Sequence, residues 1–235
     1  MPYLRPPSPD GPTRDREALV IVPADTSLPP VTVGEFAGYG LVYLTPPGAA
    51  EPHFLMDALN AGTSWLVVGN EVAVGDPASP EVLMFTAAGT RARKIVLPVK
   101  PRPFNVKALR EARDRMAPVV LGGRRVRSPS RAASDTTHFE LMFDLAKRPK
   151  TAPHFRRLVH ATNDGMWVEL YREHIGLPSA YLRIDTEGRI SGRLSGPANV
   201  EFHEFGTDYA LGVREDPETD VKSVVLYTLR RSRSR

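Results

Sequence analysis

The stretch IDTEGRISGRLSGP, at Ile184–Pro197, has the outline of a β-hairpin, and the architecture that we expect for the chain starts from it. An apolar residue is followed by three small or polar residues, a glycine, eight further residues and a proline. The same outline recurs in FTAAGTRARKIVLP, at Phe85–Pro98. Glycine in such a turn supplies the positive φ that a tight hairpin needs. A repeated outline of this length predicts a repeated structural unit.

Three longer segments share one order of elements and begin at Gly69, Asn163 and Gly206. Each has a tight turn, a short strand with an apolar or aromatic centre, a loop, and an outer strand rich in Val, Leu or aromatic residues. The first two continue through a glycine turn into a basic fourth strand that ends in proline. This order is typical of a four-stranded antiparallel blade of a β-propeller. A β-sandwich, whose hairpins also recur at short intervals, remains the alternative.

The fold class that we predict is all-β, a partial β-propeller of about three to four four-stranded antiparallel blades with one short helical insertion. Residues 1–16 are rich in proline and are expected to form a disordered leader. Residues 17–229 are expected to form the propeller-like domain, with a helix at about 104–117 and a mobile loop at 122–135. Residues 230–235 form a basic tail.

Three stretches carry a resemblance to a known family: LVHATNDGMWVELYRE, YLRIDTEGRISGRLSGP and FGTDYALGVREDPETDVKSVVLYTL. They are similar to the C-terminal blades of bacterial six-bladed β-propeller proteins of the broad NHL-like type. The resemblance covers about residues 64–229 and implies a propeller fold, but it says little about activity. Whole members of that family are longer than this chain and are usually exported. The resemblance therefore predicts an arc of blades whose end strands are open.

Four residues are expected to have structural roles. Gly165 ends the turn Asn163-Asp164-Gly165 and is expected to adopt a positive φ, as is Gly188 in the next hairpin. Trp167, like Trp65, is expected to pack between neighbouring blades. Tyr209 lies in DYALGV, which matches the closing phrase of the propeller proteins that the chain resembles.

The strongest metal-like spacing is that of Glu201 and His203 in VEFHEF. Residues two apart in a strand face the same side, so both side chains could reach one divalent ion. The flanking Phe202 and Phe205 favour a half-buried strand with polar outer positions instead. His138 and Glu140 have the same spacing and the same two interpretations. The chain has no cysteine, which excludes a thiolate metal site, and no cofactor other than this divalent metal is indicated.

The net charge of +4 comes from two segments. Eight of the 31 basic residues are arginines in GGRRVRSPSR and in the C-terminal RRSRSR, and the other 23 are outnumbered by 27 acidic residues. A nucleic-acid-binding fold usually carries its basic stripe on the ordered domain, so we expect no nucleic-acid partner. The residues that would contact a polyanion are Arg230, Arg231, Arg233 and Arg235.

These observations predict a non-catalytic, propeller-type binding or scaffold domain that meets a protein partner, or a second copy, through open blade edges. The alternative is a metal-dependent hydrolase of the six-bladed type, and a third interpretation is a nucleic-acid-associated protein. No stretch of about 18 apolar residues indicates a membrane span. The N-terminus lacks the apolar region of a signal peptide, so the sequence as written predicts a cytoplasmic location.

Overall fold

β-strands are the predominant regular structure in the computed structural model, which describes residues 11–25, 27–45, 53–57, 59, 62–117, 129–162, 165–219 and 221–230. The strands are β1 (Gly11–Ile21), β2 (Val31–Leu44), β3 (His53–Met56), β4 (Ser64–Val68), β5 (Glu71–Gly75), β6 (Glu81–Thr86), β7 (Arg91–Val96), β8 (Phe155–Ala161), β9 (Met166–Leu170), β10 (Ser179–Ile184), β11 (Ile190–Gly196), β12 (Val200–Phe205), β13 (Tyr209–Glu215) and β14 (Lys222–Thr228). The helices are α1 (Val106–Ala117) and α2 (Pro129–Phe143), followed by the 3-10 turn η2 (Leu145–Lys147).

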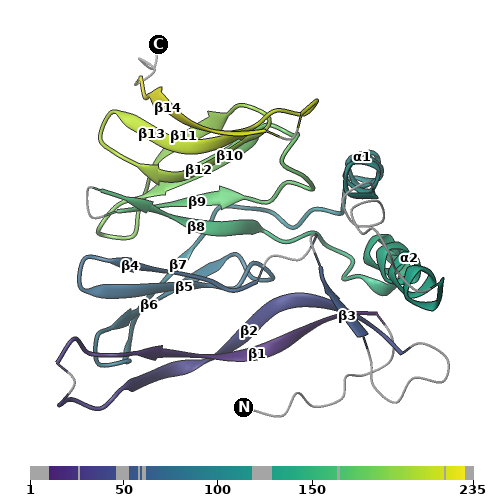
Figure 1. Cartoon of the computed structure of the whole chain (residues 1–235). Coiled ribbons are helices and arrows are strands. Elements are labelled where there is room, and N and C mark those ends of the chain that lie inside the picture. Colours follow the sequence, from purple (N-terminus) through teal and green to yellow (C-terminus); the bar gives the residue numbers. More distant parts are fainter. Residues whose placement is uncertain are drawn as a thin grey trace.

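The strands form three sheets (Figure 1). One has the order β1-β2-β3, a second has the order β4-β5-β6-β7, and a seven-stranded sheet has the order β11-β10-β9-β8-β12-β13-β14. Within the seven-stranded sheet every pair is antiparallel except β8 and β12, which run parallel. The predominance of β-structure confirms the all-β prediction, with helices added at one side.

The two hairpins quoted from the sequence are β6–β7 and β10–β11, and they share the same irregularity. Gly89 and Gly188 adopt φ values of +74° and +82° in the two turns. Each hairpin has a register shift directly before the apolar residue that opens the repeated outline, Phe85 in one and Ile184 in the other. Each hairpin is the second half of a four-stranded antiparallel meander, β4–β7 or β8–β11. The sequence repeat is therefore a structural repeat, down to its bulge.

The strands β4, β8 and β12, which begin the successive groups β4–β7, β8–β11 and β12–β14, lie next to one another. β8 pairs with β12 at Glu204↔His160 and Phe205↔Ala161. β8 also meets β4, where the Leu158 backbone N–H donates to Ser64 Oγ at 2.9 Å. The sheets are thereby stacked, with β1–β3 at one end of the stack and β12–β14 at the other, as Figure 1 shows.

Three apolar clusters fill the spaces between the stacked groups of strands, of which β8–β11 and β12–β14 are the two parts of the seven-stranded sheet. The largest joins β4–β7 to β8–β11 and includes Met84, Phe155 and Leu182. A second joins β8–β11 to β12–β14 around Trp167 and Phe205, and a third packs the β1–β2 hairpin on β4–β7. Burial of apolar surface between sheets is the main stabilising contribution in such a stack.

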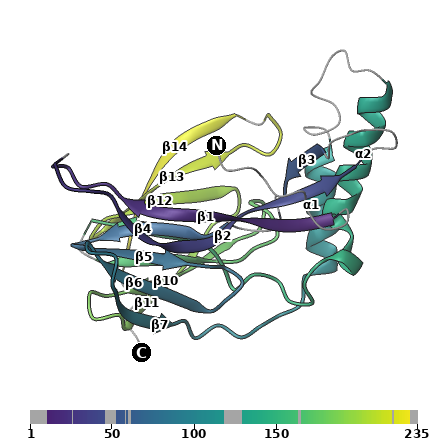
Figure 2. The ribbon, with the colours of Figure 1, turned by 90° about the horizontal axis from the view of Figure 1, so that it is seen from below.

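The two helices lie beside the sheets, near the same ends of the strands in both views (Figures 1 and 2). The helical layer is attached by a fully buried ion pair between Arg148 Nη2 and Asp57 Oδ1, which are 2.6 Å apart. A second ion pair joins Arg102 to Glu173, and the hydroxyl of Tyr171 donates to the backbone oxygen of Leu59. Arg148 and Asp57 are both removed from water, and their pairing compensates the free-energy cost of desolvating the two charges.

The helical content differs from the prediction of a single insertion. The predicted helix at 104–117 is present as α1, and the Asn105 side chain accepts from the Ala108 backbone N–H at its start. The second helix, α2, overlaps the segment that was expected to be a mobile loop at 122–135; residues 118–128 lie outside the described residues. Phe139 and Met142 are buried one helical turn apart, and this packing stabilises a helix that composition did not indicate.

The proline-rich leader was also predicted too long. Residues 11–16 belong to β1 and pair with β2, whereas residues 1–10 lie outside the described residues. Arg14 explains why residues 11–16 belong to β1. Its guanidinium donates to the backbone oxygens of Gly38 and Ala37 and forms an ion pair with Asp76 at 2.6 Å. Tertiary contacts thus outweigh the local composition.

The two tryptophans have different surroundings. Trp167 is 8% exposed and stacks on Phe205 with ring centroids 4.6 Å apart, between β8–β11 and β12–β14. Trp65 is 59% exposed, so the expectation that it packs between blades is wrong. Trp65 is on β4, opposite Val74 of β5, and it lines a small hollow beside the β1–β2 hairpin.

Gly188 adopts the positive φ expected of it, and Gly165 is constrained by a neighbouring strand. A Cβ on Gly165 would lie 2.7 Å from the backbone oxygen of Ile184, so glycine is needed there for a close approach of two strands. Asn163 and Asp164, the rest of the predicted turn, lie outside the described residues.

Replacing Trp167 with alanine should lower the free energy of unfolding by about 3–5 kcal/mol, because the change leaves a cavity between β8–β11 and β12–β14. Trp65→Ala is the matched control and should cost less than about 1 kcal/mol, since Trp65 is exposed. Urea denaturation of both variants measures the difference. Equal costs would contradict the packing described for Trp167.

Candidate functional site

The metal-like pair Glu201 and His203 lies on β12 at a β-bulge. The β12–β13 register passes from Phe202↔Gly212 to Glu204↔Leu211, which leaves His203 as the extra residue. His203 is exposed and Glu201 is half-buried. Bulges redirect side chains and are frequent beside functional sites, so the surroundings of this one decide what the pair can bind.

A second bulge lies on the neighbouring strand β8. The β8–β9 register passes from Phe155↔Leu170 to Arg157↔Glu169, and Arg156 is the extra residue. Successive side chains in a regular strand point to opposite faces, but a bulge lets two neighbours reach the same side. Arg156 and Arg157 consequently both contact the same two carboxylates, Glu169 and Glu201.

Glu169 is the centre of this charge network and is fully buried. Its carboxylate lies 2.8 Å from Arg157 Nε, 3.0 Å from Arg172 Nη2 and 3.5 Å from Arg156 Nη1. Arg172 also donates to the backbone oxygens of Ile175, Leu177 and Val200. Three guanidinium groups therefore compensate the desolvation of one buried carboxylate, which a single partner would do less completely.

The network connects β8 to β12 where their backbones have stopped pairing. Arg157 Nη2 donates to the backbone oxygen of Phe202 at 2.6 Å, and Arg157 Nη1 lies 3.2 Å from the Glu201 carboxylate. Arg156 Nη1 lies 3.0 Å from the same carboxylate. The backbone pairing of the two strands is confined to Glu204↔His160 and Phe205↔Ala161. Arginine side chains thus span the remaining gap.

The residues around Glu201 and His203 do not fit a divalent metal ion. Both oxygens of the Glu201 carboxylate face guanidinium groups, and His203 Nδ1 lies 3.4 Å from Arg157 Nη1. These positive charges would repel a cation. Across the described part of the chain, no group of three or more His, Asp or Glu side chains is placed to hold a metal. His138 and Glu140 lie on α2, not on a strand, with His138 buried and Glu140 exposed.

The guanidinium groups also determine the ionisation of Glu201. Burial alone would raise the pKa of this carboxyl, but the charges of Arg157 and Arg156 outweigh burial and hold the pKa below its ordinary value. An ionised Glu201 is therefore part of the folded structure at neutral pH. The arrangement is that of a structural ion network between two strands.

A different surface lies at the end of the stack, on the side of β12–β14 that faces away from Trp167. Opposite residues in the β13–β14 pair share a face, and Leu211↔Leu226 and Val213↔Val224 form two aliphatic pairs on the outer side. Val224 is 75% exposed and Leu226 is 70% exposed. We call these four residues the outer aliphatic patch. β14 is also the last strand of its sheet, so one backbone edge lacks a neighbouring strand in the described structure.

Polar groups border this patch. The hydroxyl of Tyr209 donates to Glu204 at 2.6 Å, and Lys222 lies 3.8 Å from Glu215 at the other end of the strand pair. Arg230 follows β14 and is exposed, whereas Arg231, Arg233 and Arg235 lie outside the described residues. An apolar centre with a polar border is typical of a protein-binding surface.

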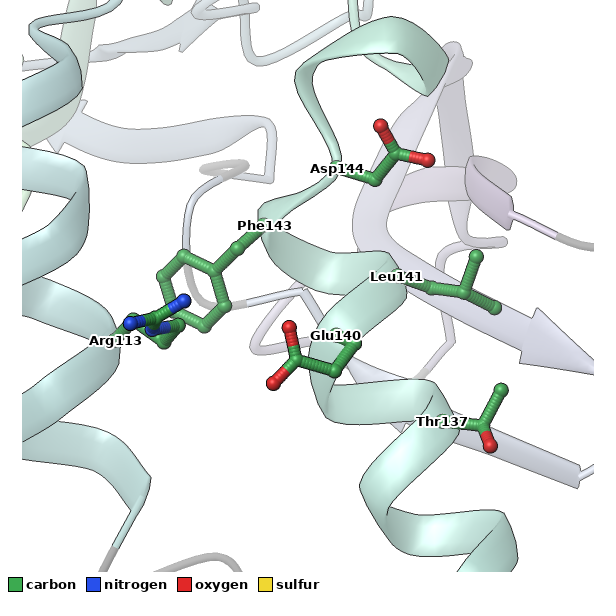
Figure 3. Close-up of a pocket in the computed structure, with 6 residues that line it drawn as sticks. All are labelled: Arg113, Thr137, Glu140, Leu141, Phe143 and Asp144. Atoms are coloured by element: carbon green, nitrogen blue, oxygen red, sulfur yellow. The ribbon is translucent and has the colours of Figure 1, made fainter.

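The hollow between the two helices offers no comparable site. It has a volume of about 370 Å³ and is lined by Arg113, Thr137, Glu140, Leu141, Phe143 and Asp144. In Figure 3, Glu140 and Phe143 point towards Arg113 on α1, whereas Thr137, Leu141 and Asp144 lie on the other side of α2. Polar groups that converge on one point define a ligand site, and these do not converge.

Comparison with known protein families gives no match, and comparison with curated proteins gives none either. Among the described helices, neither is long and apolar enough to cross a membrane.

Glu201→Gln should destabilise the protein at neutral pH, and the loss should shrink in acid. Because the folded pKa lies below the ordinary value of 4.5, the ionised carboxylate contributes stability that is fully present above that pH and is lost as the pH falls through the folded pKa. Thermal denaturation of both proteins between neutral pH and pH about 3 measures this difference. Glu218→Gln, at an exposed turn, is the control and should change stability little at any pH. A difference between wild type and Glu201→Gln that is independent of pH would contradict the ion network.

Proposed function

We propose that this chain is a non-catalytic binding or scaffold domain of the β-propeller type, which binds a polypeptide through the open β12–β14 end of its stack. The propeller assignment is supported by two four-stranded meanders with matching turns and bulges. It is also supported by first strands that lie side by side, β4 next to β8 and β8 next to β12. The similarity of the sequence to NHL-like blades accords with both features.

The observation that carries the proposal is the outer aliphatic patch. Isolated exposed apolar residues are common, but here two pairs lie next to each other on the end sheet, with the most exposed residues on the edge strand. The faces that meet inside the stack are covered by clusters that include Met84, Trp167 and Phe85, whereas the outer aliphatic patch belongs to none of these clusters in the described part of the chain. A β-strand or sheet of a partner would bury the patch in the same manner.

The charged residues at the centre of the stack support a structural role for that region. Glu169 and Glu201 are both engaged by arginines, and Arg172 is further bound to three backbone oxygens. Groups held in this way stabilise the junction between strands. The interpretation as a metal-dependent hydrolase has no such observation in its favour, because the Glu201 and His203 site is occupied by guanidinium groups.

The proposal is tested with a fluorescein-labelled peptide of alternating Val and Thr, a strand-forming probe. Fluorescence anisotropy should show saturable binding to the full chain. In the double variant Val224→Lys/Leu226→Lys the affinity should fall by at least about tenfold, or 1.4 kcal/mol. Both side chains are exposed, so circular dichroism should show an unchanged fold.

Val96→Lys is the matched control, because Val96 is 60% exposed on β7, the edge strand of another sheet. This variant should bind the probe like the wild type. Equal loss in both variants would contradict the proposed surface, as would no binding by the wild type at a concentration at which the chain is monomeric.

A further inference from the structure

The edge of β14 lacks the features that protect the other sheet edges. β7 carries Arg91, Arg93 and Lys94, and β11 contains Gly192 and Gly196 beside a register shift. β1 has two register shifts and a run of charged residues, β3 has only four residues, and β4 lies against β8. Charge, bulges and shortness are the usual means by which proteins prevent strand pairing at an edge. β14 has seven residues and an uninterrupted register with β13.

The backbone groups that face the open edge follow from the pairing with β13. Leu229 N–H donates to the Asp208 oxygen, and Asp216 N–H donates to the Val221 oxygen. Hydrogen-bonded positions alternate along an antiparallel strand, so Val221, Ser223, Val225, Tyr227 and Leu229 are the residues that bond to β13. The backbone groups of the intervening residues, Lys222, Val224, Leu226 and Thr228, therefore point to the open edge.

We propose that the occupant of this edge is a second copy of the same chain, paired antiparallel through β14 about a two-fold axis at Val225. This inference rests on the proposed function and names its partner. Val225 is the centre of β14, and an axis there uses the whole strand. Val224 then lies opposite Leu226 of the second copy, and Lys222 lies opposite Thr228. Each of these pairs brings outward backbone groups together on both strands, which is the condition for a hydrogen-bonded pair.

The side chains are compatible with this register. On the outer face, each Val224 meets a Leu226, and the pairs with Leu211 and Val213 extend the contact into two continuous aliphatic rows across both copies. Lys222 is the charged residue of β14, and it meets an uncharged Thr228. Lys222 also keeps Glu215 as its partner within its own chain. No like charges are brought together by the pairing of the two β14 strands, so the interface is self-complementary.

Disulfide trapping tests this register, because the chain has no cysteine of its own. The hydrogen-bonded pair Val224 and Leu226 of the second copy should have a Cα separation of about 5.5 Å, within the range of a disulfide. The diagonal Val224–Val224 separation should be about 7–8 Å, which is too long. A tagged Val224→Cys protein is mixed with untagged Leu226→Cys protein and oxidised under mild conditions.

The mixed disulfide dimer should exceed each homodimer by far more than the about twofold ratio that random pairing gives. Wild-type chain should show concentration-dependent dimerisation in size-exclusion chromatography with light scattering. Val96→Cys is the control for chance collisions and should give little dimer when mixed with either variant. Val224→Lys/Leu226→Lys should be monomeric.

Three outcomes would overturn the proposal. A monomer at all concentrations with random cross-linking would show that no second copy pairs here; if the Val and Thr probe peptide still bound, the proposed function would stand without it. If the probe peptide does not bind and cross-linking is not selective, the proposed dimer and the proposed function are both contradicted. If the chain dimerises but Val96→Cys is cross-linked as much as the mixture of Val224→Cys and Leu226→Cys, the interface does not lie at β14.

Discussion

The carboxylate of Glu169 has no contact with solvent, and the junction between β8, β9 and β12 depends on how its charge is compensated. Two of its arginines come from β8 and reach it together because of the bulge at Arg156. Arg157 continues to the backbone of Phe202 and to Glu201 on β12. Loss of one partner of a buried charge costs about 3–5 kcal/mol. The bulge in β8 therefore allows both arginines to reach Glu169, and these arginines in turn bridge the gap between β8 and β12.

That constraint explains how two meanders become one stack. Backbone hydrogen bonds alone join β8 to β12 only near Phe205, and they would leave the other ends of the strands to separate. The arginine side chains fill this space with charge-assisted hydrogen bonds, while Trp167 and Phe205 pack near the end where the two backbones pair. One end of the junction is held by charge and the other by aromatic contact.

Much of the β-structure could be predicted from the sequence, because hairpins are encoded locally. The glycines at positions 89 and 188 and the alternation around them were sufficient for both repeated hairpins. The failures concern features that depend on distant contacts. Helix α2 is stabilised by the burial of Phe139 and Met142, and the start of β1 is stabilised by the ion pair of Arg14 with Asp76. The apolar spacing of Phe139 and Met142 in α2 is short and adjoins a polar, Ser-rich segment, and the ion pair of Arg14 leaves no periodic signal in the sequence.

The candidate site shows the same limit. Strand spacing brought Glu201 and His203 to attention, but the sequence contains no sign that a bulge in β8 sends two arginines towards them. The pair Arg156-Arg157 precedes an alternating strand and reads as an ordinary solvent-exposed face. Burial of Glu169 was equally invisible, because a lone glutamate in MWVEL has the position of an outward residue. Only the three-dimensional pairing shows which charges meet.

The parallel pairing of β8 with β12 also bears on the order of folding. β9, β10 and β11 lie between these two strands in the sequence, and each of them pairs with the strand that directly precedes it. Closing β8 onto β12 encloses this whole segment, and the entropic cost falls once the meander has shortened the loop. The contact around Phe205 should therefore form late, so that changes there accelerate unfolding more than they slow folding. The exposed end of the stack would then be the last part of the chain to take its final shape.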